Sequence, residues 1–386
     1  MRICYFGTYD PTFPRNALLL AALRAVGAEV VECRAPLWRG TADKLAAVRG
    51  RAAGLGWRIA RAWRALLARH RAVGDYDVLL VGYAGHLDVL LAHSLARRRG
   101  RPLVLDAFLS LAETLEDRNL APVGTARWRL ARLLDRLACR RADRVLVDTR
   151  AHAVYFARAL GIPPARLAVV PMGAWPRPPL PLPPADRFEV LYYGAYIPLH
   201  GLEYMLDAAA QLADLPHVHF TLVGDGQEYA ATVARARRKG LANVRFVRTW
   251  LPEDALVTRY LATAHVCLGI FGASPKAARV VPAKVFLALA AGRPVVTRDS
   301  PAAREVLVHG EQALLCPPAD GTALASALRR LHADAALRAR LAAAGPPLIA
   351  ARYSPLPLGQ QLLATLTADP PDGIHTASPP TQTGAR

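Results

Sequence analysis

A loop rich in cations, followed by an apolar helix, is the stretch of the sequence best suited to chemistry. Residues 265–271 form an apolar, partly β-branched run typical of a buried strand. Residues 272–281 then break this pattern with glycine, serine, proline and cations, among them Lys276. An apolar helix is expected over about 282–291, with Lys284 in its first turn.

This arrangement predicts an anion site. The first N–H groups of a helix have no partner within the helix, and the helix dipole adds positive potential there. Lys276, Arg279 and Lys284 add three cations. Only four of the 49 Lys and Arg residues are lysines, yet two of the four fall here, where a compact ammonium suits a phosphate oxygen. We therefore expect a phosphate; the alternative is a solvated loop that happens to hold two lysines.

The same region carries a family resemblance. Residues 281–296 read VPAKVFLALAAGRPVV, and they are followed by DSPAARE at 299–305 and LLCPPAD at 314–320. These motifs resemble the C-terminal domain of retaining GT-B glycosyltransferases of family 4, also called glycosyltransferase group 1. The resemblance implies an α/β fold of two Rossmann-like parallel-sheet domains facing across a cleft. It also implies transfer of a sugar from a nucleotide-diphosphate donor.

The resemblance further implies which residues bind the donor. Two glycine turns, one after the strand expected at 188–193 and one after the strand expected at 219–223, resemble the family's turns beside the diphosphate and nucleotide. A third turn, after the first strand of the chain, lies where open α/β sheets place ligands. The expected donor-binding residues are Gly7, Thr8, Gly194, His200, Gly224, Asp225, Gly226, Arg279, Pro282, Ala283 and Glu305.

The sequence departs from the family pattern at four of its positions. Relatives usually place an arginine and a lysine on the diphosphate where this chain has Ala195 and His200. Relatives also carry two glutamates eight positions apart, at the places of Arg279 and Leu287. Without the arginine and lysine at 195 and 200, more of the phosphate contacts are expected from Lys276, Arg279 and Lys284. An arginine in place of a sugar-binding carboxylate would favour a negatively charged donor.

Two residues of the N-terminal half are candidates to orient donor or acceptor. His86 follows the strand expected at 77–82, and Asp106 ends the strand expected at 102–106, where relatives commonly carry a donor-contacting histidine. Asp75 and Asp77 superficially form a D-x-D metal pair, but they precede a strand and are interpreted as a solvated turn. The chain lacks the G-x-G-x-x-G pattern of dinucleotide-binding enzymes.

The expected mechanism follows from where charge develops. Breaking the anomeric C–O bond leaves a diphosphate, whose growing negative charge is stabilised by prearranged cations and N–H groups. Lys276 and Lys284 are expected in this role, with His86 and Asp106 orienting the substrates. No carboxylate pair is evident as a covalent nucleophile, which fits the front-side displacement that the family implies. The nucleotide sugar is a substrate, and no cofactor or metal is expected.

Proline content and the resemblance together predict the domain boundaries. A linker with six prolines separates two halves, each large enough for its own core. The expected units are an acceptor domain at 1–174, the linker at 175–186, a donor domain at 187–350, a helix returning to the first domain at 351–369, and a disordered tail at 370–386.

The formal charge of +19 predicts an anionic partner. Residues 49–71 carry seven arginines, no acid and an apolar stripe, so contact with an anionic membrane surface is expected there, although the stripe could instead pack on its own domain. No spanning helix or signal peptide is evident, and five scattered cysteines read as reduced core residues. We expect a cytoplasmic protein, peripheral at the inner face of the membrane, with a glycan or lipid-linked acceptor.

Two other functions stay open at this point, with nucleic-acid binding a weaker third. A GT-B enzyme of another reaction, such as a nucleotide-sugar epimerase or a glycan phosphorylase, is the first alternative, and an epimerase would use acid and base carboxylates in the cleft. A degenerate scaffold, or a binder of anionic surfaces, would keep the fold without the two glutamates. Nucleic acid is not expected as a partner, because no motif of that kind occurs and aromatic residues do not alternate with the cations outside 49–71.

Overall fold

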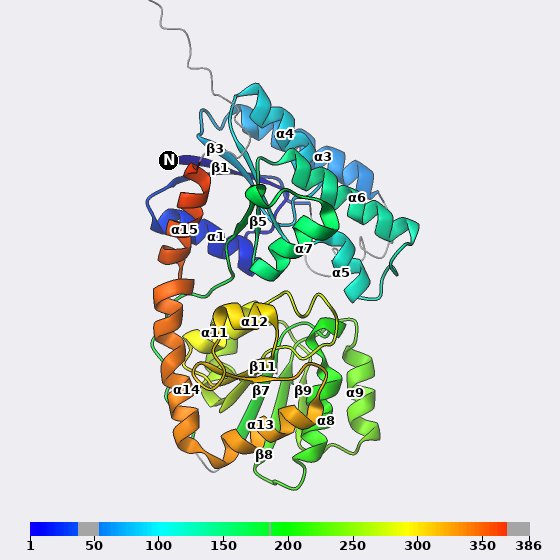
Figure 1. Cartoon of the computed structure of the whole chain (residues 1–386), viewed down its shortest axis with the longest axis vertical. Coiled ribbons are helices and arrows are strands. Elements are labelled where there is room, and N and C mark those ends of the chain that lie inside the picture. Colours follow the sequence, from blue (N-terminus) through cyan, green and yellow to red (C-terminus); the bar gives the residue numbers. More distant parts are fainter. Residues whose placement is uncertain (38–53, 185–186, 369–386) are drawn as a thin grey trace, which may run out of the picture.

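The computed structural model describes residues 1–37, 54–184 and 187–368 and contains two α/β domains (Figure 1). Each domain has a six-stranded sheet in which every paired strand is parallel. Parallel sheets are covered on both faces, which explains why their strands are apolar runs without alternation. The predicted fold class is therefore confirmed. The predicted tail at 370–386 and the first residues of the basic segment, 49–53, lie outside the described residues.

The N-terminal sheet has the order β2-β1-β3-β4-β5-β6. One face packs against α1 and the C-terminal helix α15, and the other against α3, α4, α6 and α7. The strands are β1 (Arg2–Gly7), β2 (Glu29–Arg34), β3 (Val78–Val81), β4 (Leu103–Phe108), β5 (Arg144–Val147) and β6 (Leu167–Val169). The helices are α1 (Pro14–Ala25), α3 (Leu55–Arg71), α4 (Asp88–Arg98), α5 (Leu111–Asp117), α6 (Ala126–Arg141), α7 (Arg150–Leu160) and the short η1 (Pro164–Arg166).

The C-terminal sheet has the order β12-β11-β10-β7-β8-β9. Its strands are β7 (Phe188–Tyr193), β8 (Val218–Val223), β9 (Val244–Val247), β10 (Val266–Leu268), β11 (Val295–Arg298) and β12 (Ala313–Cys316). Its helices are η2 (Pro198–His200), α8 (Leu202–Gln211), α9 (Tyr229–Arg238), α10 (Glu253–Arg259), η3 (Leu261–Thr263), α11 (Ala283–Ala290), α12 (Pro301–Val306) and α13 (Gly321–Ala333). The strand expected at 265–271 is thus shorter, because Gly269 packs against Thr297 and the chain turns away there.

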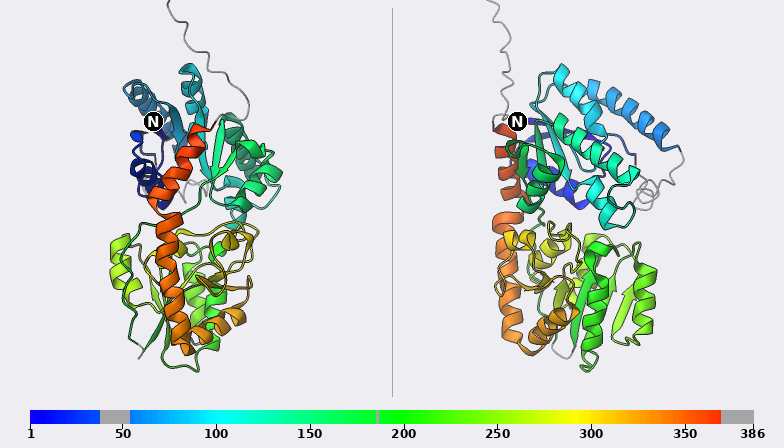
Figure 2. Two further views of the ribbon diagram at one scale, coloured as in Figure 1. Left: turned by 60° about the vertical axis from the view of Figure 1, so that its left-hand side comes forward. Right: turned by 45° about the vertical axis from the view of Figure 1, so that its right-hand side comes forward.

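The end of the described chain ties the two domains together. Helix α14 (Ala335–Leu348) packs against α11, a π-turn η4 (Ile349–Tyr353) follows, and α15 (Pro355–Thr367) packs against α1 (Figure 2). Two prolines inside α14 account for the turn, because each removes a backbone donor. A Cβ at Gly359 would lie 2.1 Å from the Ala22 carbonyl oxygen, so glycine permits this close approach. Helix α15 is therefore the part of this segment that packs on the N-terminal domain.

Several other sequence-based expectations can be compared with the structure. The five cysteines are free and buried, as expected. In the segment expected as a linker, residues 175–184 form no helix or strand, and Arg293 donates hydrogen bonds to the carbonyl oxygens of Leu180 (3.1 Å) and Pro181 (2.7 Å). Among the helices that the structure describes, none has the length and apolar character needed to cross a bilayer.

Candidate active site

Lys284 lies buried at the carboxyl end of strand β7. It is the second residue of α11 and is 8% exposed. Its Nζ lies 3.9 Å from the centroid of the Tyr192 ring and 3.5 Å from His200 Nδ1. Burial lowers the pKa of Lys284 well below its ordinary value, and no carboxylate among the described residues offsets this effect. A buried ammonium without a counter-ion is stabilised by an anion, so these surroundings favour a negatively charged ligand.

Two glycines allow the backbone to approach Lys284. Gly194 has a φ of +140°, and a Cβ there would lie 2.9 Å from Lys284 Nζ. Gly224 has a φ of +139°, and a Cβ there would lie 1.9 Å from the Gly194 carbonyl oxygen. Only glycine fits these positions without strain. The expected turns at Gly194 and at Gly224–Gly226 therefore meet at one end of the sheet, where Pro282 caps α11 and Ala283 opens it.

His200 contributes shape to this end of the sheet but no charge. It is buried, with Nδ1 2.5 Å from the Ala195 carbonyl oxygen and 2.7 Å from the Tyr192 hydroxyl. Burial and the nearby Lys284 lower the pKa of His200 well below its ordinary value. The imidazole is therefore neutral near pH 7, and an anion bound at this position would favour the ammonium form of Lys284.

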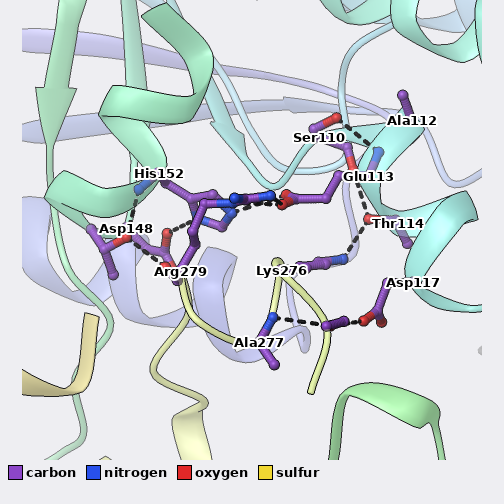
Figure 3. A network of polar contacts seen from close by, with 12 residues as sticks. Ser110, Ala112, Glu113, Thr114, Asp117, Asp148, His152, Lys276, Ala277 and Arg279 are labelled. Atoms are coloured by element: carbon purple, nitrogen blue, oxygen red, sulfur yellow. Dashed lines mark hydrogen bonds and ion pairs between the residues drawn. The ribbon is translucent and has the colours of Figure 1, made fainter. Parts of the chain in front are cut away.

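The loop before α11 crosses to the N-terminal domain (Figure 3). Lys276 Nζ donates a 2.7 Å hydrogen bond to Thr114 Oγ1, and the Ser274 hydroxyl donates a 2.5 Å hydrogen bond to Asp117 Oδ1. Lys276 is 5% exposed, and burial lowers its pKa although the Glu113 and Asp117 carboxylates oppose the effect. The two expected catalytic lysines thus lie in different settings, Lys276 at the domain contact and Lys284 beside β7.

Arg279 forms an ion pair across the two domains. Its Nε donates to Glu113 Oε1 at 2.8 Å, and its guanidinium carbon lies 4.4 Å from the centroid of the Tyr155 ring. The Thr149 hydroxyl also donates a 2.6 Å hydrogen bond to the Arg279 carbonyl oxygen. In this arrangement the guanidinium is already neutralised. A charged donor could contact Arg279 only in competition with Glu113.

Glu113 continues into a buried chain of charges within the N-terminal domain. His152 lies between two carboxylates, with Nε2 3.2 Å from Glu113 Oε2 and Nδ1 2.5 Å from Asp148 Oδ1. Burial alone would lower the pKa of His152, but Asp148 and Glu113 raise it to about 9. His152 is therefore an imidazolium at neutral pH. The charges alternate along this network. The cation Arg279 contacts Glu113, which contacts the imidazolium of His152, and His152 in turn contacts Asp148 (Figure 3).

Glu305 makes a second contact between the domains. Its two carboxylate oxygens accept hydrogen bonds from the backbone N–H groups of Arg150 (2.8 Å) and Ala151 (3.0 Å). These groups belong to the first turn of α7, where free N–H groups and the helix dipole favour a carboxylate. Glu305, expected to bind the donor, is thus engaged with the opposite domain in this structure.

Asp106 lies in a buried ion pair. Arg15, which is fully buried, donates to both oxygens of Asp106 and to the carbonyl oxygens of Val170 (2.7 Å) and Pro171 (3.1 Å). Burial raises the pKa of Asp106 although Arg15 opposes the effect. The pair connects the first helix, the fourth strand and the chain after β6. This placement favours a structural role for Asp106 rather than contact with a substrate.

The remaining candidates of the N-terminal domain lie in its interior. His86 is 1% exposed, and its Nε2 lies 3.5 Å from Asp135 Oδ1, while neither ring nitrogen makes a hydrogen bond within the described part of the chain. Asp88 accepts hydrogen bonds from the Thr8 N–H (2.7 Å) and hydroxyl (2.8 Å) and fixes the Gly7 turn. The described residues contain no group of three or more His, Cys, Asp or Glu side chains placed to hold a metal ion.

Three residues of this site were not assigned a role from the sequence. Glu113 and His152 lie in the interdomain network, and Arg118 lies beside it. The Arg118 carbonyl oxygen accepts a 3.0 Å hydrogen bond from Gln227 Nε2 of the other domain, and its charge lowers the pKa of both His200 and Lys276. The available signal was position alone, because Glu113 and Arg118 follow the carboxyl end of β4. Which residues they contact depends on how the domains pack.

Comparison with protein families assigns both domains. Residues 8–173 match the glycosyl transferase 4-like domain, and residues 187–334 match the glycosyl transferases group 1 domain. Together these matches cover every strand from β2 to β12. The boundary between them falls within the proline-rich segment.

Characterised relatives are similar over part of their length. The alpha-D-kanosaminyltransferase of Streptomyces kanamyceticus is 28% identical over 178 residues, which are 46% of this chain and 45% of that protein. The phosphatidyl-myo-inositol mannosyltransferase of Mycobacterium leprae (strain TN) is 34% identical over 160 residues, 40% of each chain. The chain spans about half the length of the curated relatives that it matches.

Solved structures share the fold over almost the whole chain. A sucrose-phosphate synthase from Thermosynechococcus elongatus has a TM-score of 0.72 at 18% identity, covering 94% of this chain and 97% of that one. HepE from Anabaena in complex with UDP-glucose has a TM-score of 0.67 at 19% identity, covering 95% and 99%. With two parallel-sheet domains that each match a glycosyltransferase domain, the chain belongs to the GT-B glycosyltransferases, with a 4-like domain followed by a group 1 domain.

Proposed function

We propose that this protein is a retaining glycosyltransferase. It moves a sugar from a nucleotide-diphosphate donor to a glycan or lipid-linked acceptor in envelope polysaccharide or glycolipid synthesis. The observation that carries the proposal is the buried amine of Lys284, which lies beside the Gly194 turn and has no carboxylate partner among the described residues. The relatives named above include a kanosaminyltransferase and a mannosyltransferase, and one solved neighbour holds UDP-glucose.

Lys284 stabilises the leaving diphosphate in this mechanism. Negative charge grows on the diphosphate as the anomeric C–O bond breaks, and a desolvated cation lowers the energy of that charge most effectively. The adjacent glycine turns let the diphosphate approach the backbone, and Arg118 and Lys276 add positive potential from the domain contact. With the family's glutamates replaced by Arg279 and Leu287, the sugar is held by other groups. The front-side displacement expected for the family needs no carboxylate nucleophile, because the leaving diphosphate and the acceptor share one face of the sugar.

The position of Arg279 bears on the choice of donor sugar. Its ion pair with Glu113 already satisfies the guanidinium, so a negatively charged donor requires that this pair opens. A neutral donor does not. The structure therefore weakens the expectation of an acidic donor that the sequence alone raised, and Arg279 is better explained as a contact between domains.

An anionic membrane surface is the proposed second partner, reached through the basic helix α3. The described part of the basic segment keeps Arg58, Arg61 and Arg64 beside Trp57, which is 67% exposed. The inner face of the helix, with Ala62 and Leu66, packs in the core of the domain. Its outer face is therefore left to contact a membrane surface. A peripheral position at the inner face of the membrane would bring a lipid-linked acceptor to the enzyme.

A panel of nucleoside diphosphates and their sugars tests the proposal. Binding is measured as a shift in the thermal unfolding midpoint, and turnover as release of the nucleoside diphosphate, with and without lipid-linked acceptors. We expect at least one nucleotide to stabilise the protein, and its sugar to be consumed when an acceptor is present. If no nucleotide shifts the midpoint, a scaffold without catalysis replaces this proposal. If a donor is converted to an isomer without an acceptor, an epimerase replaces it.

A further inference from the structure

Helix α6 carries a row of leucines on its outer surface. Leu130, Leu133 and Leu137 are 67%, 51% and 37% exposed, and their spacing of three and four residues places them on one face. The opposite face already packs into the domain core through Ala138 and Cys139. The outer leucines are therefore not needed to hold the helix on its own sheet.

The charged side chains exposed on α3, α4 and α6 are all cations. Helices α3, α4 and α6 lie side by side on the same face of the N-terminal sheet (Figures 1 and 2). Together they carry thirteen arginines and two acids, Asp88 and Asp135. Both acids are buried, at 2% and 0% exposure, and accept hydrogen bonds from inside the domain. The outer layer of the three helices thus presents positive charge without any exposed acid.

Charge decides between two occupants of the leucine row. In a second copy of the chain, two α6 helices packed through their leucines would place Arg129 and Arg140 near their counterparts, and the like charges would repel each other. An anionic lipid surface accepts both features, because arginines bind headgroups while apolar side chains enter the boundary with the acyl chains. The observations therefore favour lipid over self-association.

The chain that leads into α6 passes the contact between the domains. Val123, which is 59% exposed, lies in the turn between α5 and α6. Five residues earlier, the Arg118 carbonyl oxygen accepts a hydrogen bond from Gln227 of the C-terminal domain. A surface bound along α6 therefore ends close to the contact between the domains, where Lys276 and Asp117 lie.

We propose that the outer face of α6, formed by Leu130, Leu133 and Leu137 with the arginines around them, inserts into the headgroup layer of a membrane that contains anionic lipid. The inference deepens the proposed function, since it supplies the surface from which a lipid-linked acceptor reaches the enzyme. It is independent of catalysis itself. It also differs from contact through α3, because α6 provides the apolar side chains that enter the lipid and α3 adds charge.

Vesicle flotation tests this assignment. The full chain is mixed with vesicles of phosphatidylcholine alone or of phosphatidylcholine with phosphatidylglycerol. The Leu130→Ser, Leu133→Ser, Leu137→Ser triple variant is compared with a control that carries Val308→Ser and Leu356→Ser, two exposed residues of the C-terminal half (52% and 50%). We expect the parent and the control to bind anionic vesicles and the triple variant to bind at least tenfold more weakly. Circular dichroism confirms that each variant is folded.

A dye placed on the helix locates the inserted element. The five native cysteines are buried, so a Leu133→Cys variant labels at one position with an environment-sensitive dye. We expect its emission to rise and shift to the blue on anionic vesicles, with no change for a dye at Val308→Cys. Equal vesicle binding by the triple variant and the parent, or a response only at Trp57→Cys, overturns the role of α6.

The remaining outcomes separate this inference from the proposed function. Failure of the parent to bind anionic vesicles, or capture of an acidic protein in place of lipid, also overturns the inference. Neither result affects turnover of a nucleotide sugar with a soluble acceptor. Loss of that turnover in the parent would count against the proposed function and leave a lipid-binding result for α6 unaffected.

Discussion

Arg279 Nε of the C-terminal domain lies 2.8 Å from Glu113 Oε1 of the N-terminal domain, so one ion pair joins the two halves of the molecule. Glu113 is 2% exposed, and its other oxygen contacts His152. A buried carboxylate that loses one of two cationic partners is costly, because the remaining charges stay desolvated. The pair therefore holds the domains in one arrangement and couples that arrangement to the loop that carries Lys276.

Replacing Glu113 tests this coupling. A Glu113→Gln variant removes the charge that pairs with Arg279 and His152, so we expect a more open arrangement and a larger radius of gyration in small-angle scattering. Turnover of the nucleotide sugar should fall at least tenfold, since misplacement of a binding loop by about 1 Å is enough for such an effect. Glu116→Gln is the matched control, because Glu116 lies on the same helix and is exposed. Equal scattering and turnover in both variants would exclude the coupling.

Removing the Lys284 ammonium should affect catalysis more than folding. A Lys284→Ala variant loses the cation beside the leaving diphosphate, so we expect turnover to fall by about one to three orders of magnitude. Stability should change little or improve, because a buried ammonium without a partner is itself unfavourable. The stabilisation that a nucleoside diphosphate gives should also shrink. Lys239→Ala is the control, since Lys239 lies on the surface near Asp207. An unchanged rate in the folded Lys284 variant removes this residue from the mechanism.

The sequence predicted the fold, and it placed the Gly194 turn and Lys284 at one end of the same sheet, because both depend on local patterns. The apolar strands, the glycine at Gly194 and the lysine at Lys284 could be placed by spacing, and the turns do meet at one end of the C-terminal sheet. Each of these features is fixed within one α/β unit. The turns meet because they follow neighbouring parallel strands, whose carboxyl ends lie at the same edge of the sheet.

Contacts between the domains could not be predicted in the same way. Arg279 and Glu305 were expected to bind the donor, and in the structure both bind the opposite domain. Asp106 was expected to orient a substrate, but its partner Arg15 lies 91 residues away in the sequence. No hydrophobic or helical pattern in the sequence indicates that the two residues of such a pair are in contact. They depend on how two independently folded sheets come together.

The charge on His152 should make stability depend on pH. Its pKa is raised to about 9 in the folded protein by Asp148 and Glu113, against an unfolded value near 6.5. This contribution is fully present below pH 6.5 and is lost as the pH rises through 9, and it amounts to at most about 3 kcal/mol. We expect the unfolding midpoint to fall between pH 7 and pH 10. His152→Gln should flatten the curve in this window. A parent curve that is level from pH 7 to pH 10 would contradict the assignment.

Arg118 should supply a cation that the C-terminal domain lacks at Ala195 and His200. Its charge acts on His200 and Lys276, and its main chain is held to the opposite domain by Gln227. Because the guanidinium belongs to the N-terminal domain, it reaches the diphosphate only when the domains are together. We expect Arg118→Ala to raise the KM for the nucleotide sugar about tenfold or more and to reduce stabilisation by the nucleoside diphosphate, while the protein alone unfolds as before. Arg118→Lys should recover part of the effect, since the charge remains but the planar fork is lost. Arg330→Ala, on the exposed side of α13, is the matched control, and a KM for Arg118→Ala equal to that of this control would place Arg118 outside the donor site.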